Sequence, residues 1–176
     1  MTSCPFAAEA ARYTYDVREW GIATSPMMSV AAWHESLGTL GRMIDRGSDF
    51  RPGDDRPDVL LLRKIIDDKV KNALIRVVTE SILLLIHLGV EDPAAAFVAE
   101  WERAAVKHPG MTLDCDGPTD ELRFYALAEE VGEVAASLTY DNANSTGHGA
   151  DTIAEVTQVG ALALAWLTRY QDGGER

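Results

Sequence analysis

The sequence predicts an all-α protein, a helical bundle of four or more helices. Apolar side chains recur every three or four residues, caps and prolines open the segments, and no segment alternates at period two long enough to form a strand. The chain has 176 residues, of which 47% are hydrophobic. A chain of this length can bury a core without disulfide bonds or structural metals.

The first two predicted helices have clear beginnings and ends. Ser25 precedes Pro26, the arrangement of an N-cap followed by proline in the first turn, and the apolar pattern then runs to Gly47. A longer amphipathic stretch begins at Asp58 and ends at Gly89. We therefore expect helices over 26–47 and 58–89.

Three further helices are predicted in the second half of the chain. Asp92 with Pro93 repeats the cap-plus-proline signal, Thr119 precedes two acidic residues that favour a helix N-terminus, and Asp151 follows a segment rich in Asn, Ser and Gly. The expected helices are 93–107, 119–139 and 151–170, with a loop over 141–149. We expect residues 1–90 to form a helical N-terminal extension that packs on the bundle, and residues 91–176 to form its core.

Composition excludes several classes of function. The 16 Lys and Arg against 28 Asp and Glu give a net charge of −12, so the chain lacks the positive charge that a nucleic acid polymer requires. No apolar run approaches the length of a membrane span, and no apolar signal core opens the sequence. Cys4 and Cys115 form no metal or redox motif, which suits a reducing compartment. We expect a soluble cytoplasmic protein without membrane partners. The acidic composition does not exclude a small phosphorylated ligand when a metal ion supplies the positive charge.

The residues that carry chemistry are acidic and begin on the helix predicted at 119–139. Glu130 and Glu133 are one helical turn apart, on a stripe beside the apolar face, and Glu129 is adjacent. The last predicted helix repeats the arrangement with Glu155 and Gln158. If the two helices pack antiparallel, as a short connection favours, the polar stripes face each other. The pattern then predicts several carboxylates around one cavity.

Such a cluster favours a hard divalent cation. Neighbouring carboxylates raise one another's pKa and resist burial unless a positive charge compensates them. Mg²⁺ prefers carboxylate oxygens and keeps positions for water and substrate phosphates. The same spacing is also common on solvated helix faces, where carboxylates form surface salt bridges. The residues alone leave both interpretations open.

Two segments resemble a known enzyme family. Residues 127–135 read LAEEVGEVA and residues 151–159 read DTIAEVTQV, and this pair of acidic segments resembles the MazG-like all-α nucleoside triphosphate pyrophosphohydrolases. The segment 107–114, KHPGMTLD, resembles the stretch that precedes the first motif in shorter members of the family. The resemblance extends over residues 93–172.

The resemblance implies Mg²⁺-dependent hydrolysis, with Mn²⁺ able to substitute, of a nucleoside triphosphate to the monophosphate and pyrophosphate. The substrate is typically a deoxy or non-standard nucleotide. Glu130, Glu133 and Glu155 match the metal-binding carboxylates, and the resemblance implies a catalytic group of Glu129, Glu130 and Glu133. Gln158 occupies the fourth metal position, where the family usually has Asp, and its neutral oxygen is a weaker ligand.

Other residues are candidates for binding substrate. Arg123 lies on the acidic stripe and Lys107 ends the preceding helix, so both can reach phosphate, although each is also an ordinary surface or helix-end cation. Tyr140, Asp141 and Asn142 lie in the loop between the motifs, where a base or sugar can be recognised, although Asp and Asn are also common turn residues. The apolar content favours a homodimer or higher homo-oligomer.

Alternatives to this activity stay open at the level of sequence. Gln158 in place of Asp is compatible with a non-catalytic protein that senses nucleotides, or with a helical interaction protein that uses residues 1–90. An enzyme acting on another pyrophosphate-linked molecule is a further alternative. These hypotheses differ in whether the chain binds metal, binds nucleotide and releases products.

Overall fold

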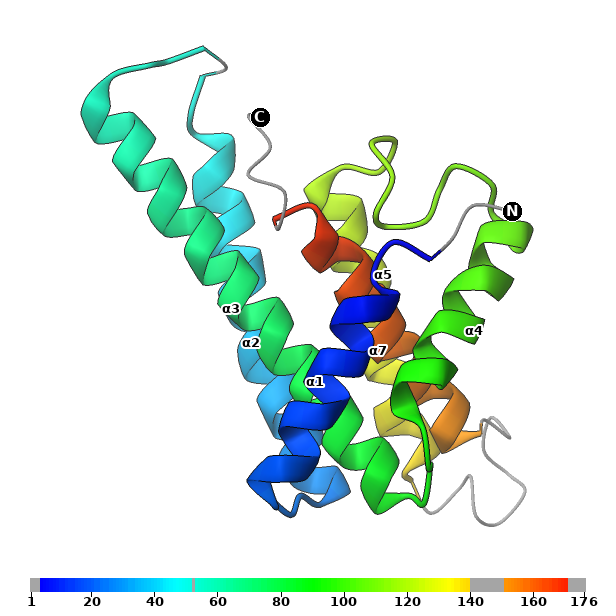
Figure 1. Cartoon of the computed structure of the whole chain (residues 1–176). Helices are drawn as coiled ribbons and strands as arrows, with labels where there is room; N and C mark the ends of the chain where they lie inside the picture. The colour runs from blue at the N-terminus through cyan, green and yellow to red at the C-terminus, as the bar shows by residue number, and fades with distance from the viewer. Residues whose placement is uncertain (1–3, 52, 140–150, 171–176) are drawn as a thin grey trace.

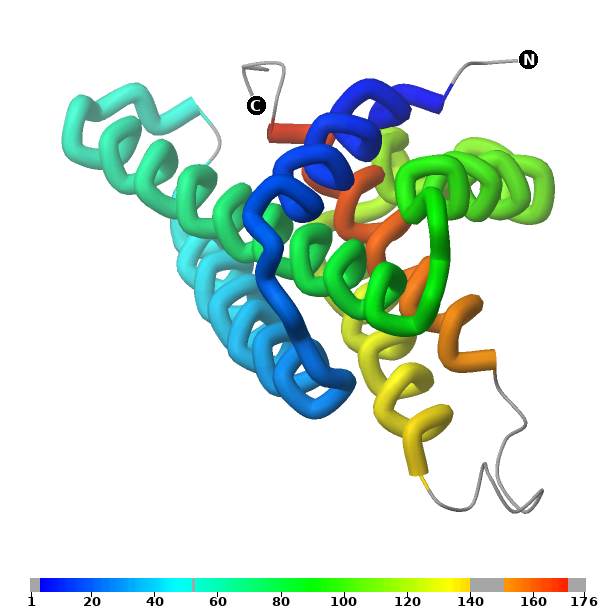
Figure 2. The backbone as a smooth tube through the Cα atoms, turned by 60° about the horizontal axis from the view of Figure 1, so that its bottom comes forward, coloured from blue at the N-terminus to red at the C-terminus, as the bar shows by residue number. Residues whose placement is uncertain are grey.

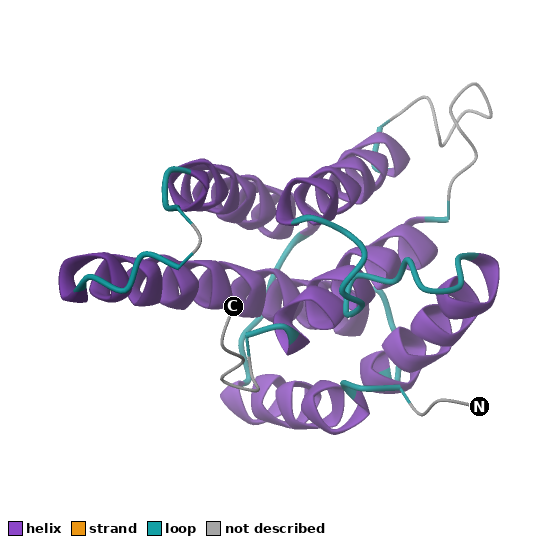
Figure 3. Ribbon diagram, turned by 90° about the horizontal axis from the view of Figure 1, so that it is seen from above, coloured by secondary structure: helices purple, strands orange, loops and turns teal. Residues whose placement is uncertain are grey.

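Six α-helices make up the part of the chain that the computed structural model describes, namely residues 4–51, 53–139 and 151–170 (Figures 1 and 3). They are α1 Ala7–Trp20, α2 Pro26–Ser48, α3 Pro57–His87, α4 Pro93–Lys107, α5 Asp120–Ser137 and α7 Thr152–Thr168. No strand occurs within the described residues, so the all-α prediction is confirmed. None of the described helices is long and apolar enough to cross a membrane.

The predicted helix starts are confirmed by side-chain caps. At the start of four helices a side-chain oxygen accepts a backbone N–H bond, and the capping residues are Ser25, Asp92, Thr119 and Asp151. Proline occupies the first turn of α2, α3 and α4. A backbone N–H at this position has no hydrogen-bond partner within the helix, so its absence in proline costs nothing. Local chemistry therefore sets where these helices begin.

Helix α1 is not among the predicted helices. Its apolar residues Ala10, Tyr13 and Val17 are buried, together with Phe6 just before it, at a spacing of three or four residues. The periodic signal was therefore present in the sequence, although charged residues between these positions obscure it. Gly21 ends the helix with a φ of 59°, in the left-handed region that favours glycine.

Helices α2, α3, α5 and α7 form a four-helix bundle, and α1 and α4 cover one side of it (Figures 1 and 2). Both α3 and α5 pack against α2 and against α7. Helix α1 packs on α3 and α4, and α4 packs on α7. Among the described helices, the two halves of the chain meet mainly where α1 packs on α4, α2 on α5 and α3 on α7, and α3 also contacts α4.

One hydrophobic core spans both halves of the chain. Trp33 on α2 and Leu74 on α3 belong to the same buried cluster as Leu127 on α5 and Trp166 on α7, and each of the four side chains is fully buried. Residues 1–90 therefore contribute three helices to a shared core. The acidic helices α5 and α7 depend on this contribution, because their apolar faces pack against α2 and α3.

Gly160 determines how closely α7 approaches α4. A Cβ at this position would lie 2.2 Å from Cε1 of Phe97, and the Phe97 side chain is fully buried. Only a residue without a side chain fits here. The close approach brings polar side chains of α4 beside those of α7, where the candidate site lies.

Candidate metal centre

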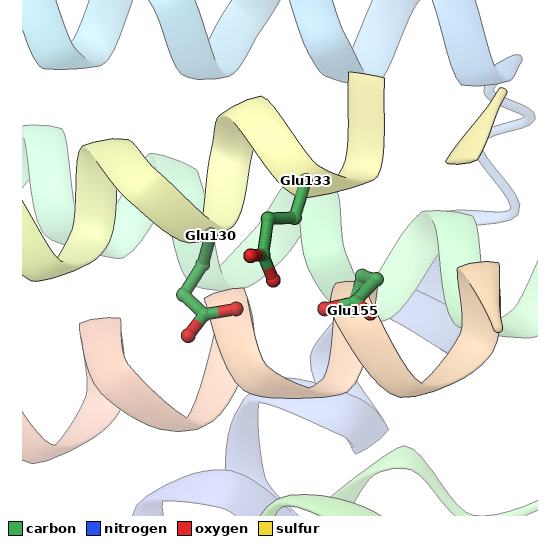
Figure 4. Close-up of side chains that lie close together, drawn as sticks. All are labelled: Glu130, Glu133 and Glu155. Carbon is green, nitrogen blue, oxygen red and sulfur yellow. The ribbon is translucent and has the colours of Figure 1, made fainter. Parts of the chain in front are cut away.

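Three carboxylates from two helices converge near the end of the bundle where α5 finishes and α7 begins (Figures 1 and 4). Glu130 and Glu133 lie one turn apart on α5, and Glu155 lies in the first turn of α7. One carboxylate oxygen from each residue lies within 4.8 Å of the other two. The acidic stripes of the two helices therefore face each other, as their spacing in the sequence predicts.

Glu130 lies deepest in this cluster. Its Oε2 is fully buried and has no hydrogen-bond partner among the residues that the structure describes. Burial raises the pKa of Glu130 to about 7, and the negative charges of Glu133 and Glu155 contribute to the increase. Burial, followed by the charge of Glu133, also raises the pKa of Glu155. The cluster is therefore unfavourable at neutral pH without a positive charge beside it.

We expect the protein in EDTA to lose stability as the pH rises from about 4.5 to about 7. In this window the folded chain keeps a proton on Glu130 that the unfolded chain releases, so the free energy of unfolding falls with increasing pH. Solvent screens this half-buried group, which limits the loss to about 1–2 kcal/mol. The measurement is thermal unfolding at pH 5 and pH 8. The Glu130→Gln variant should lack this part of the slope and be more stable than the wild type at pH 8; an identical slope in both proteins would contradict the assignment.

A pocket of about 330 Å³ opens beside the carboxylates, between α4, α5 and α7. Glu129, Glu130 and Gln158 line it from α5 and α7, whereas Arg103 and Lys107 line it from α4. The apolar part of its lining includes Trp101, Leu113, Ala161, Leu162 and Ala165. The pocket therefore combines carboxylates of α5, the amide of Gln158 on α7, charged side chains of α4 and an apolar floor.

Gln158 lies beside the cluster, but its amide is already engaged. Its Nε2 donates a hydrogen bond to Oε2 of Glu155 at 2.8 Å, and its Oε1 accepts one from Arg103 at 3.4 Å. The oxygen that the sequence assigns to the metal therefore faces a guanidinium group. Ligation of a metal by Gln158 stays a prediction.

Two residues of α4 near the site were missed at the level of sequence. Arg103 forms an ion pair with Glu100 at 2.6 Å, and both line the pocket. The signal that could have indicated them is their i,i+3 spacing on a predicted helix. Nothing in that spacing places them beside Glu155, because α4 reaches the site through its packing on α7.

Arg123 is not among the residues that line this pocket, and its expected role in binding phosphate stays a prediction. Only 5% of the residue is exposed, and its guanidinium donates to the carbonyl oxygens of Leu113 at 2.8 Å and Cys115 at 2.5 Å. It also pairs with Asp120 at 3.1 Å. These contacts join the connection between α4 and α5 to the first turn of α5, so Arg123 has a structural role.

We expect Arg123→Lys to lower the free energy of unfolding by about 1–2 kcal/mol, because lysine keeps the charge but cannot bond two carbonyl oxygens and a carboxylate in the same plane. Denaturant titration measures the loss. Arg46→Lys, at an exposed position on α2, is the matched control and should change stability by less than about 0.5 kcal/mol. Equal stabilities of the two variants would contradict a structural role for Arg123.

The remaining predicted residues are distributed as follows. Glu129 is exposed at the pocket, and Lys107 lines it at the end of α4. Asp151 is the N-cap of α7, and its Oδ1 accepts the backbone N–H of Ile153 at 2.9 Å. The predicted substrate-binding residues Tyr140, Asp141 and Asn142 lie outside the described residues.

No family model, curated protein or solved structure matches this chain. Assignment of the site therefore rests on its own chemistry. Three carboxylates, one of them with a buried oxygen that lacks a partner, form a donor set that fits a hard divalent cation such as Mg²⁺. Such a cation would also compensate the burial and the neighbouring negative charges that raise the pKa of Glu130.

Proposed function

We propose that the protein is a Mg²⁺-dependent nucleoside triphosphate pyrophosphohydrolase. The observation that carries this proposal is the convergence of Glu130, Glu133 and Glu155, whose carboxylate oxygens lie within 4.8 Å of one another. The two segments that resemble MazG-like enzymes supply these same residues. The reaction consumes one water, cleaves one phosphoanhydride bond and releases a nucleoside monophosphate and pyrophosphate.

The pocket beside the carboxylates supports a phosphorylated ligand with an apolar end. Glu130, Glu133 and Glu155 would hold the metal, which supplies positive charge to the phosphates and lowers the pKa of a bound water. Lys107 brings a second positive charge to the pocket from α4. Glu129, exposed beside Glu130, is placed to orient the ligand or a water molecule. The apolar floor, with Trp101 and Leu162, suits the nucleoside.

The test is hydrolysis by the purified 176-residue chain with Mg²⁺, with Mn²⁺ and with EDTA. The panel contains the ribo and deoxy nucleoside triphosphates, oxidised and deaminated analogues, and other pyrophosphate-linked molecules. We expect equal amounts of monophosphate and pyrophosphate from a subset of the triphosphates, and none in EDTA. Release of diphosphate and inorganic phosphate, or no turnover across the panel, would reject the proposal. Turnover of only the other pyrophosphate-linked molecules would retain the metal centre and change the substrate class.

A nucleotide-sensing protein without catalytic activity is the second candidate. The observation that favours it is the bonding of Gln158 to Arg103, which leaves three carboxylates at the site. Isothermal titration separates the two functions, because a sensor binds nucleotide in the presence of Mg²⁺ and releases no product. A helical interaction protein that uses residues 1–90 would bind neither nucleotide nor metal. The expected homodimer and the cytoplasmic location stay predictions, and light scattering tests the first.

A further inference from the structure

Helix α4 brings an ion pair to the edge of the acidic cluster. Arg103 donates to both carboxylate oxygens of Glu100, at 2.6 and 2.8 Å. The Glu100 side chain is 17% exposed, whereas that of Arg103 is 54% exposed. Bidentate pairing of this kind restricts the guanidinium plane more than a single contact would. The largely buried carboxylate therefore holds Arg103 in a defined orientation.

Gln158 connects the guanidinium of Arg103 to the acidic cluster through two hydrogen bonds. Arg103 donates to Oε1 of Gln158 at 3.4 Å, and Nε2 of Gln158 donates to Oε2 of Glu155 at 2.8 Å. A side-chain amide accepts at one end and donates at the other, so its two neighbours determine which way it faces. Aspartate at position 158 could pair with Arg103, but it would repel Glu155 and donate nothing to it.

We propose that Arg103 and Gln158 are positioning residues for the metal centre: Arg103 orients Gln158, and Gln158 holds the Glu155 carboxylate toward the cation. Glutamine at position 158 is then a hydrogen-bond donor that this site requires, and not a weakened metal ligand. This inference rests on the metal centre of the proposed function and is independent of the identity of the nucleotide.

The two explanations of Gln158 predict opposite effects of removing Arg103. If Gln158 is a ligand, Arg103→Gln frees its oxygen and removes a positive charge near the cation, so Mn²⁺ should bind more tightly. If Gln158 is a positioning donor, the same change releases the amide and Mn²⁺ should bind about 10-fold more weakly, within the range found for partners that orient metal ligands. Arg103→Lys keeps the charge without the planar fork and should have an intermediate effect.

The experiment measures the Mn²⁺ dissociation constant of the full chain by isothermal titration, with thermal unfolding of every variant to check folding. Gln158→Met removes both hydrogen bonds at similar size and should weaken Mn²⁺ binding about 10- to 100-fold. The double variant Arg103→Gln with Gln158→Met should be no weaker than Gln158→Met alone, because Arg103 acts through Gln158. The matched control is Arg76→Gln, which breaks an exposed ion pair with Glu35 on the α2–α3 surface and should leave the constant unchanged.

Turnover measured on the same proteins separates this inference from the proposed activity. Unchanged or tighter Mn²⁺ binding by Arg103→Gln would overturn the positioning roles. An unchanged Mn²⁺ dissociation constant with a raised KM for nucleotide at saturating Mn²⁺ would also overturn them, because that result assigns Arg103 to phosphate binding. A wild-type chain that binds Mn²⁺ but hydrolyses no nucleotide would reject the activity alone. A wild-type chain that binds no Mn²⁺ would overturn both.

Discussion

Replacing Glu133 with glutamine is expected to reduce nucleotide hydrolysis at a fixed Mg²⁺ concentration at least about 100-fold. Removing a partner that only orients a metal ligand costs roughly 10- to 100-fold, so loss of a ligand should reach the upper end of that range or exceed it. Glu133 is the exposed member of the cluster, so the variant should fold normally. Pyrophosphate release measures the activity, and Mn²⁺ titration measures the accompanying loss of affinity.

Glu102→Gln is the matched control for this prediction. Glu102 is an exposed residue of α4, and its replacement removes the same unit of negative charge at similar size. It should retain nearly full activity and Mn²⁺ affinity. A Glu133→Gln variant that is as active as Glu102→Gln would show that Glu133 does not hold the cation, and the proposed metal centre would then fail.

Replacing Gly160 with alanine is expected to destabilise the fold by about 3 kcal/mol, at the upper end of the range for overpacking a core. The new Cβ would lie 2.2 and 2.4 Å from two carbons of the Phe97 ring, which is fully buried and has little room to move. For a chain of this size the change corresponds to a fall in Tm of roughly 6–12 °C. Thermal and denaturant unfolding measure it.

Gly132→Ala is the matched control, because a Cβ at this exposed position of α5 would meet nothing within 4 Å. It should stabilise the protein by about 0.5–1 kcal/mol, since alanine favours the helical conformation more than glycine does. Phe97→Leu combined with Gly160→Ala should recover part of the lost stability by making room for the methyl group. Equal stabilities of the Gly160→Ala and Gly132→Ala variants would show that α4 and α7 do not pack as closely as described.

Local signals account for most of what sequence analysis predicts about this fold. A capping side chain such as Thr119 satisfies backbone groups within the next few residues, so its meaning does not depend on distant parts of the chain. Helix α1 lacks a side-chain cap, and its buried residues Ala10, Tyr13 and Val17 lie among charged residues that weaken the periodic pattern. Nothing local indicated that α1 lies on α4.

In the candidate site, too, some features follow from local sequence and others from the packing of distant helices. The sequence by itself determined that Glu130 and Glu133 share one face of a helix, since helical periodicity places residues three apart on the same side. Only the tertiary structure decided that Arg123 binds the connection before α5, and that Arg103 reaches Gln158 from another helix. The physical reason is that these contacts depend on how closely whole helices pack. Core side chains from all the helices together determine that packing, so no short segment encodes it.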